Sequence, residues 1–131
     1  MTTVVNSFRD LRVWQAGMAL VERVYELTRP FPTQEAYGLT GQMRRAAVSI
    51  PSNIAEGHTR EHTKEYLHHL SMAQASLAEL QTQIEIARRL HYLSTESVDL
   101  LLGQAASLSR QLFALRNGLL KRNPSGFHPN P

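Results

Sequence analysis

The residues best suited to bind a charged partner are three arginines near the middle of the chain. Arg44 and Arg45 fall in the first turns of a predicted helix, where the helix dipole disfavours cations, and Arg60 follows the expected end of that helix. Two explanations stay open for Arg44 and Arg45: a carboxylate partner in the same or another subunit, or an external anion such as phosphate. The candidate carboxylates are Glu22, Glu26 and Glu56. With phosphate as the partner, Arg44, Arg45 and Arg60 would form a nucleic-acid-binding site with little sequence specificity.

Other basic residues have a structural explanation. Arg88 and Arg89 fall near the end of a predicted helix, and four more cations follow Asp99, the last acidic residue. These four are Arg110, Arg116, Lys121 and Arg122. Cations in the last turns of a helix complement its dipole, so we expect these residues to stabilise helix ends.

Four aromatic residues lie on apolar stripes of predicted helices. They are Trp14, Tyr25, Tyr66 and Phe113. In such positions we expect core packing rather than stacking on nucleobases. Nucleic-acid binding, if present, would therefore depend on phosphate charge.

Three histidines have a spacing that could bind zinc. His58 and His62 are four residues apart and His69 lies two turns further, so one continuous helix would place all three on about the same face. Gly57 and an expected helix cap within residues 59–63 argue against a continuous helix. Solvated surface histidines are the favoured interpretation.

Catalytic motifs are missing from the sequence. A bundle that binds two irons needs an inward Glu and a Glu-x-x-His pair from several helices, and only Glu65-x-x-His68 has that spacing. The chain also lacks a Gly-rich phosphate loop, a Ser-His-Asp order and a nucleophile elbow. We expect a protein that is not an enzyme and has no metal and no cofactor.

The apolar pattern predicts four helices. Ser7 to Asp10 is typical of a helix cap, and the prolines of Arg29 to Pro32 end the first helix. The second helix covers about residues 37–57. In the third, over residues 62–91, seven apolar positions repeat alternately every four and three residues, and the fourth begins near Ser94 or Thr95. This pattern predicts an all-α, up-and-down four-helix bundle.

Composition agrees with one domain. The chain has 131 residues, of which 42% are apolar and 19% charged, no cysteine and a net charge of +3. We expect residues 1–121 to form a single bundle domain and residues 122–131 to form a disordered tail. Neither a signal sequence nor an apolar run of membrane-spanning length is visible, so a cytoplasmic protein without membrane contact is expected.

The second predicted helix contains an internal proline. Pro51 cannot donate a backbone hydrogen bond to Ala47, so we expect a kink or a break near Pro51. Short polar side chains could bond the backbone groups that a kink frees, and Asn53 is expected to be buried. Gly57 is placed to end the helix in a left-handed conformation.

The first predicted helix carries two apolar stripes instead of one. Leu11, Trp14, Met18, Val21 and Tyr25 form one stripe, and Val13, Leu20, Val24 and Leu27 form the other. A lone bundle needs one buried stripe on each helix. We therefore expect the protein to self-associate.

These features carry a family resemblance. The run from Arg44 to Gly57, with Phe8 to Trp14, Tyr37 to Thr40 and Ser76 to Gln83, resembles the small bundle proteins encoded within intervening sequences of bacterial large-subunit ribosomal RNA genes. The similarity spans about residues 8 to 121. The chain departs from that pattern at Ala75, where glycine is usual, and at His62, where a small polar cap is usual.

The resemblance implies a four-helix bundle that assembles into a five-fold ring and whose biochemical role is largely undefined. A related branch, the accessory proteins of diversity-generating retroelements, implies nucleic acid and a reverse transcriptase as partners. The function expected is therefore a non-catalytic homopentamer that binds RNA or DNA. The alternative is a protein-interaction scaffold or an accessory subunit for a partner enzyme such as a reverse transcriptase.

Overall fold

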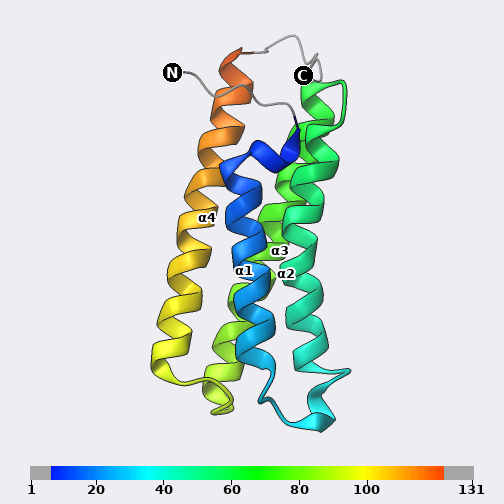
Figure 1. Cartoon of the computed structure of the whole chain (residues 1–131). Helices are drawn as coiled ribbons and strands as arrows, with labels where there is room; N and C mark the ends of the chain where they lie inside the picture. Colours follow the sequence, from blue (N-terminus) through cyan, green and yellow to red (C-terminus); the bar gives the residue numbers. More distant parts are fainter. Residues whose placement is uncertain (1–6, 123–131) are drawn as a thin grey trace.

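The structure is a computed structural model that describes residues 7–122, and it is built from four long helices. Their bounds are α1 Arg12–Thr28, α2 Leu39–His58, α3 Thr63–Arg89 and α4 Thr95–Arg122. Two 3-10 turns, η1 Phe8–Asp10 and η2 Thr33–Glu35, precede α1 and α2. Successive helices run in opposite directions along one axis (Figure 1), so the predicted up-and-down four-helix bundle is confirmed. None of the helices in the described residues is long and apolar enough to cross a membrane.

The ends of the helices differ slightly from those expected. Ser7 does form a capping box with Asp10, but the box caps η1, and α1 begins at Arg12. Helix α1 ends at Thr28, directly before the Arg29 to Pro32 segment, as the prolines predict. Helix α4 continues through Arg122, one residue beyond the expected domain boundary, and the predicted tail beyond it lies outside the described residues.

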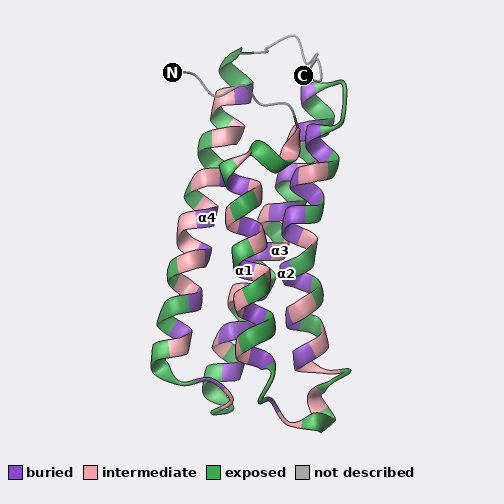
Figure 2. Cartoon of the chain, in the orientation of Figure 1, coloured by how far each residue is buried: buried purple, intermediate pink, exposed green. Residues whose placement is uncertain are grey.

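The core follows the apolar periodicity closely. All seven predicted positions of α3 are buried: Tyr66, Leu70, Ala73, Leu77, Leu80, Ile84 and Ala87. Figure 2 shows the buried residues on the inward faces of the helices and the exposed residues on the outer faces. Among the aromatic residues, core packing is right for Tyr66, which is 1% exposed, but wrong for Tyr25 and Phe113, which are 41% and 52% exposed. Trp14 is half-buried.

Helix α2 does not break at Pro51. It is continuous from Leu39 to His58 with Pro51 inside, and a bend at this position stays a prediction. Pro51 is buried against α1, where a Cβ added to Gly17 would lie 3.4 Å from the Pro51 Cβ. The proline therefore contributes to the core contact between α1 and α2.

Gly57 has a different role from the one expected. The helix continues past it to His58, and the residue that caps it, Thr59, has a right-handed φ of −83°. A Cβ on Gly57 would lie 2.8 Å from the Cβ of His69 and 2.9 Å from Cδ1 of Tyr66. Gly57 therefore lets α3 approach the end of α2 closely.

A partly buried polar network, which we call the Asn53 network, joins α2 to α3. The amide Nδ2 of Asn53 donates to the Ser49 carbonyl at 2.9 Å and lies 3.1 Å from the Ser49 Oγ, which is 2.9 Å from the Ser76 Oγ. The Asn53 Oδ1 is 3.0 Å from Nδ1 of His69, and Oε2 of Glu56 lies 3.7 Å from the same nitrogen. The prediction that Asn53 is buried and bonded to the backbone and a neighbouring helix is confirmed.

We predict that Asn53→Leu lowers the free energy of unfolding by about 1–3 kcal/mol, because His69 Nδ1 loses its acceptor inside the bundle. Chemical denaturation measures the change. Ser52→Ala is the matched control, since Ser52 is an exposed neighbour on the same helix and its replacement should change stability by less than about 0.5 kcal/mol. Equal effects of the two substitutions would contradict a structural role for the Asn53 network.

We predict opposite signs for two Gly→Ala substitutions in helices. Gly57→Ala should destabilise by about 1–3 kcal/mol, because its methyl group overlaps α3. Gly103→Ala in α4 should stabilise by about 0.5–1 kcal/mol, because a Cβ there meets nothing within 4 Å and alanine favours the helix. Thermal melting of both variants tests the contact, and a stabilising Gly57→Ala would refute it.

Candidate nucleic-acid interface

Arg44 is held in the contact between α1 and α2. Its Nε donates to Oγ1 of Thr28 at 3.0 Å and its Nη2 donates to the Tyr25 carbonyl at 3.4 Å. The guanidinium carbon also lies 4.5 Å from the centre of the Tyr25 ring. The carbonyl end of α1, which carries partial negative charge, thus meets the start of α2 and offsets the unfavourable position of Arg44 in its own helix.

The expected carboxylate partners do not account for Arg44 and Arg45 within the chain. In the described residues neither arginine lies within 4.0 Å of an Asp or Glu oxygen. Glu26 instead pairs with Arg23 at 3.3 Å, and Glu56 faces His69. The intramolecular ion-pair explanation is therefore wrong, and Arg44 is held by neutral groups of α1.

A surface pocket lies beside these arginines. We call it the arginine pocket; its volume is about 460 Å³ and its lining is Tyr25, Gly41, Arg44, Arg45, Val48 and Ser49. Two guanidinium groups but no carboxylate belong to this lining. Arg45 is exposed, and a Cβ on Gly41 would lie 3.1 Å from its Nη1, so glycine leaves room for this side chain over the start of α2. The arrangement suits an anion with several oxygen acceptors, such as a phosphate group.

Arg60 lies apart from the other two predicted site residues. It follows the C-terminal end of α2, and the helix between Arg45 and Arg60 extends over about 20 Å at 1.5 Å per residue. Arg60 lines a second pocket of about 400 Å³, which we call the histidine pocket. Its lining is Arg60, Lys64, Glu65, His68 and His69. The three arginines therefore belong to two separate surfaces.

Positive charge gathers at the end of the bundle that holds Arg60. The half made of residues 7–19, 49–76 and 109–122 contains eight Lys and Arg but only four Asp and Glu. The opposite half, residues 20–48 and 77–108, contains six and seven. Both helix starts and helix ends contribute, because the chain turns back on itself three times (Figure 1). This basic end also contains Arg9, Arg12 and Lys64. They were not among the predicted site residues, because the sequence alone does not show which helix ends are adjacent.

Arg88 and Arg89 are occupied by a neighbouring acid. Arg88 forms hydrogen bonds with the Glu85 carboxylate, and Arg89 Nε lies 3.4 Å from it. The hydrogen bond from Arg88 lowers the pKa of Glu85 to about 2, with a further contribution from Arg89. These two arginines have a structural explanation, as expected, although their partner is a side chain rather than the helix dipole alone.

The three histidines considered for zinc are not arranged as a metal site in the described residues. His58 is buried with its ring edge-on to Tyr66 at 5.9 Å, and His69 is mostly buried in the Asn53 network, so surface solvation is wrong for both. The chain between α2 and α3 is not helical at residues 59–62, which separates His58 and His62 from His69. No group of three His, Cys, Asp or Glu in the described part of the chain could hold a metal ion.

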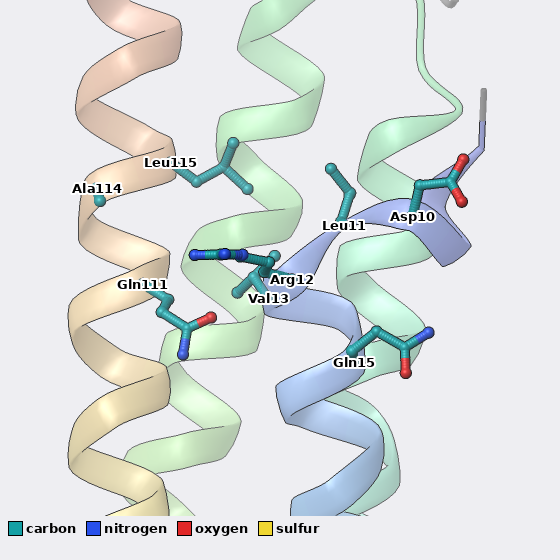
Figure 3. A pocket seen from close by; sticks show the side chains of 8 residues that line it. All are labelled: Asp10, Leu11, Arg12, Val13, Gln15, Gln111, Ala114 and Leu115. Atoms are coloured by element: carbon teal, nitrogen blue, oxygen red, sulfur yellow. The ribbon is translucent and has the colours of Figure 1, made fainter. Parts of the chain in front are cut away.

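A larger pocket of about 790 Å³ lies between the start of α1 and α4. Figure 3 shows Leu11 and Leu115 beside it and Arg12 extending toward α4, while Asp10 points away. One guanidinium and one carboxylate belong to its lining, so it has no strong preference for an anion. The arginine pocket is the better candidate for phosphate.

Comparison with known proteins supports the fold and identifies the family. The family profile described as 23S rRNA-intervening sequence protein matches residues 9–114. A crystal structure of a protein with unknown function from the S23 ribosomal protein family of Bacteroides thetaiotaomicron is similar, with a TM-score of 0.74 and 17% identity; the match covers 80% of this chain and 95% of that one. No curated protein matches the chain significantly. Since the profile covers most of the sequence, the chain belongs to the 23S rRNA-intervening sequence protein family.

Proposed function

We propose that this protein is a non-catalytic, oligomeric bundle that binds RNA or DNA through phosphate contacts with little sequence specificity. The observation that carries the proposal is the arginine pocket, where Arg44 and Arg45 lie together without a carboxylate in the lining. A cationic pocket without a carboxylate in its lining is suited to bind an external anion.

The two arginines would contribute differently. Arg44 is already ordered by Thr28 and the Tyr25 ring, so less side-chain entropy is lost when an anion binds to its remaining N–H groups. Arg45 is exposed and supplies a second guanidinium to the same phosphate or to its neighbour. Phosphate contacts position a nucleic acid without reading its bases, which accounts for the weak specificity.

Arg60 would bind the same nucleic acid at a second point. A duplex advances about 3.4 Å along its axis for each nucleotide of a strand, so about 20 Å between Arg45 and Arg60 corresponds to roughly six steps. The excess of cations at the Arg60 end favours this extended contact.

Self-association is supported by an apolar recess on the outer side of α1 and α2. Its volume is about 280 Å³, and we define the apolar recess by its lining: Trp14, Met18, Val21, Val48, Pro51, Ser52 and Ala55. Val48 is 40% exposed there, and Trp14 and Val21, from the α1 stripe that faces the recess, are only partly buried against the core. In the five-fold ring that the family resemblance implies, a charge of +3 on each copy would give +15.

The second candidate function is a protein-interaction scaffold or an accessory subunit for a partner enzyme such as a reverse transcriptase. The same apolar recess favours it, because exposed apolar surface can bind a different protein as well as another copy. Retention of a partner at high salt and after nuclease treatment would favour this scaffold.

We predict that Arg45→Ala weakens binding of a fluorescent RNA or DNA oligomer by about threefold to tenfold at low salt and reduces the salt slope by about one. Fluorescence anisotropy at several salt concentrations measures both quantities. Arg89→Ala is the matched control, since it removes one exposed guanidinium at the same end of the bundle but outside the arginine pocket.

Arg44→Ala together with Arg45→Ala should abolish most binding while circular dichroism still shows a helical protein. Equal losses from Arg45→Ala and Arg89→Ala would show that net charge rather than the pocket governs binding. If the wild type binds neither RNA nor DNA at low salt, the result would favour the scaffold function.

We predict a native mass several times the 14.8 kDa of one chain. Size exclusion with light scattering measures it, and a pentamer is the expected species. Val48→Glu should lower the mass, because it places a charge in the apolar recess. A monomer mass for the wild type at micromolar concentration would contradict the ring.

A further inference from the structure

The Asn53 network determines which way the Asn53 side chain points. Its nitrogen lies 2.9 Å from the Ser49 carbonyl, which can only accept a hydrogen bond. That atom must therefore be the NH2 group, and the atom 3.0 Å from His69 must be the amide oxygen. The orientation follows from the hydrogen bonds alone.

This orientation in turn assigns the ring nitrogens of His69. The amide oxygen of Asn53 only accepts, so Nδ1 of His69 carries the hydrogen that lies between them. In a neutral imidazole the other nitrogen, Nε2, then has a free lone pair and acts as an acceptor. The His69 side chain is 12% exposed and lines the histidine pocket, and no hydrogen bond of its Nε2 is found in the described residues.

The rest of the histidine pocket adds cations beside this acceptor. Arg60 and Lys64 belong to its lining, with Glu65 as the one carboxylate and His68 as the second imidazole, its ring 6.0 Å from that of His69. Glu56 faces Nδ1 from the α2 side. The lining therefore combines two positive groups with a histidine whose neutral ring has an acceptor nitrogen.

We infer that the histidine pocket binds a ribose-phosphate unit of RNA and gives the protein a preference for RNA over DNA. Arg60 and Lys64 contact the phosphate, and the ribose 2′-hydroxyl donates a hydrogen bond to Nε2 of His69. The inference deepens the proposed function and rests on it, since it names the kind of nucleic acid.

A hydroxyl group fits this pocket better than a second anionic oxygen does. The lone pair of Nε2 repels an oxygen anion, whereas it accepts a hydrogen bond from a hydroxyl group. Glu65, the one carboxylate of the lining, offsets one of its two positive charges, so a ligand with one phosphate and one neutral donor matches the lining. The 2′-hydroxyl is the group that distinguishes RNA from DNA, and it lies on the sugar next to a phosphate.

The test compares three uridine oligomers that share one sequence and length: the ribose form, the 2′-deoxy form and the 2′-O-methyl form. The methyl form keeps the oxygen but cannot donate. We expect the ribose oligomer to bind the full-length wild-type protein about threefold to tenfold more tightly than either analogue, as one net hydrogen bond predicts.

His69→Phe should remove this preference and leave affinity for the deoxy oligomer unchanged. His68→Phe is the matched control, since His68 lines the same pocket but has no bond to Asn53, and it should keep the preference. Circular dichroism verifies folding, and the three-oligomer comparison on the wild type decides the question even when His69→Phe does not fold.

Equal binding of all three oligomers by the wild type would overturn the assignment while leaving the proposed function in place. A preference that persists in folded His69→Phe would overturn it too. Absence of binding to any oligomer would overturn both the assignment and the proposed function.

Discussion

Much of the geometry of this bundle follows from how closely α2 approaches α3. Gly57 has no side chain, so Tyr66 and His69 of α3 pack directly against the end of α2. That close approach allows Asn53 to reach His69 and Ser49 to reach Ser76. These polar bonds have geometric requirements that apolar contacts lack, and they fix the register of the two helices. The same register places Arg60 and Lys64 beside His69.

The other side of α2 meets α1 in a contact of a different kind. Pro51 packs on Gly17, and the carbonyl end of α1 faces the first turns of α2. Arg44 is cationic at a helix start, yet the neighbouring helix supplies the partial negative charge that its own helix does not. Antiparallel helices always bring opposite dipole ends together, so this arrangement is available to any up-and-down bundle. Here it fixes Arg44 and leaves Arg45 exposed beside it.

The sequence predicted the fold well and the candidate site only in part. Periodicity identified four helices and the buried face of α3, because a seam such as Leu70, Leu77 and Ile84 is a local signal. The prediction that Gly57 ends α2 was wrong. A glycine near a helix end is commonly a terminator, and the close approach of α3 that requires this glycine is not visible in the sequence. The candidate site also grouped Arg60 with Arg44 and Arg45, although about 20 Å of helix separates Arg60 from the other two. The fold of the whole bundle determines which helix ends are adjacent. The basic end around Lys64 could therefore not be predicted from the sequence alone.

Arg44 and Arg45 are the residues that we propose to make the main phosphate contacts. Titration of the isotope-labelled protein with a short uridine oligomer, followed by nitrogen–proton correlation spectra, locates the contact directly. The side-chain Nε–H signals of Arg44 and Arg45 and the backbone amide of Gly41 should shift together and saturate at one concentration. Shifts confined to other arginines, with these three signals unchanged up to saturation, would contradict the assignment.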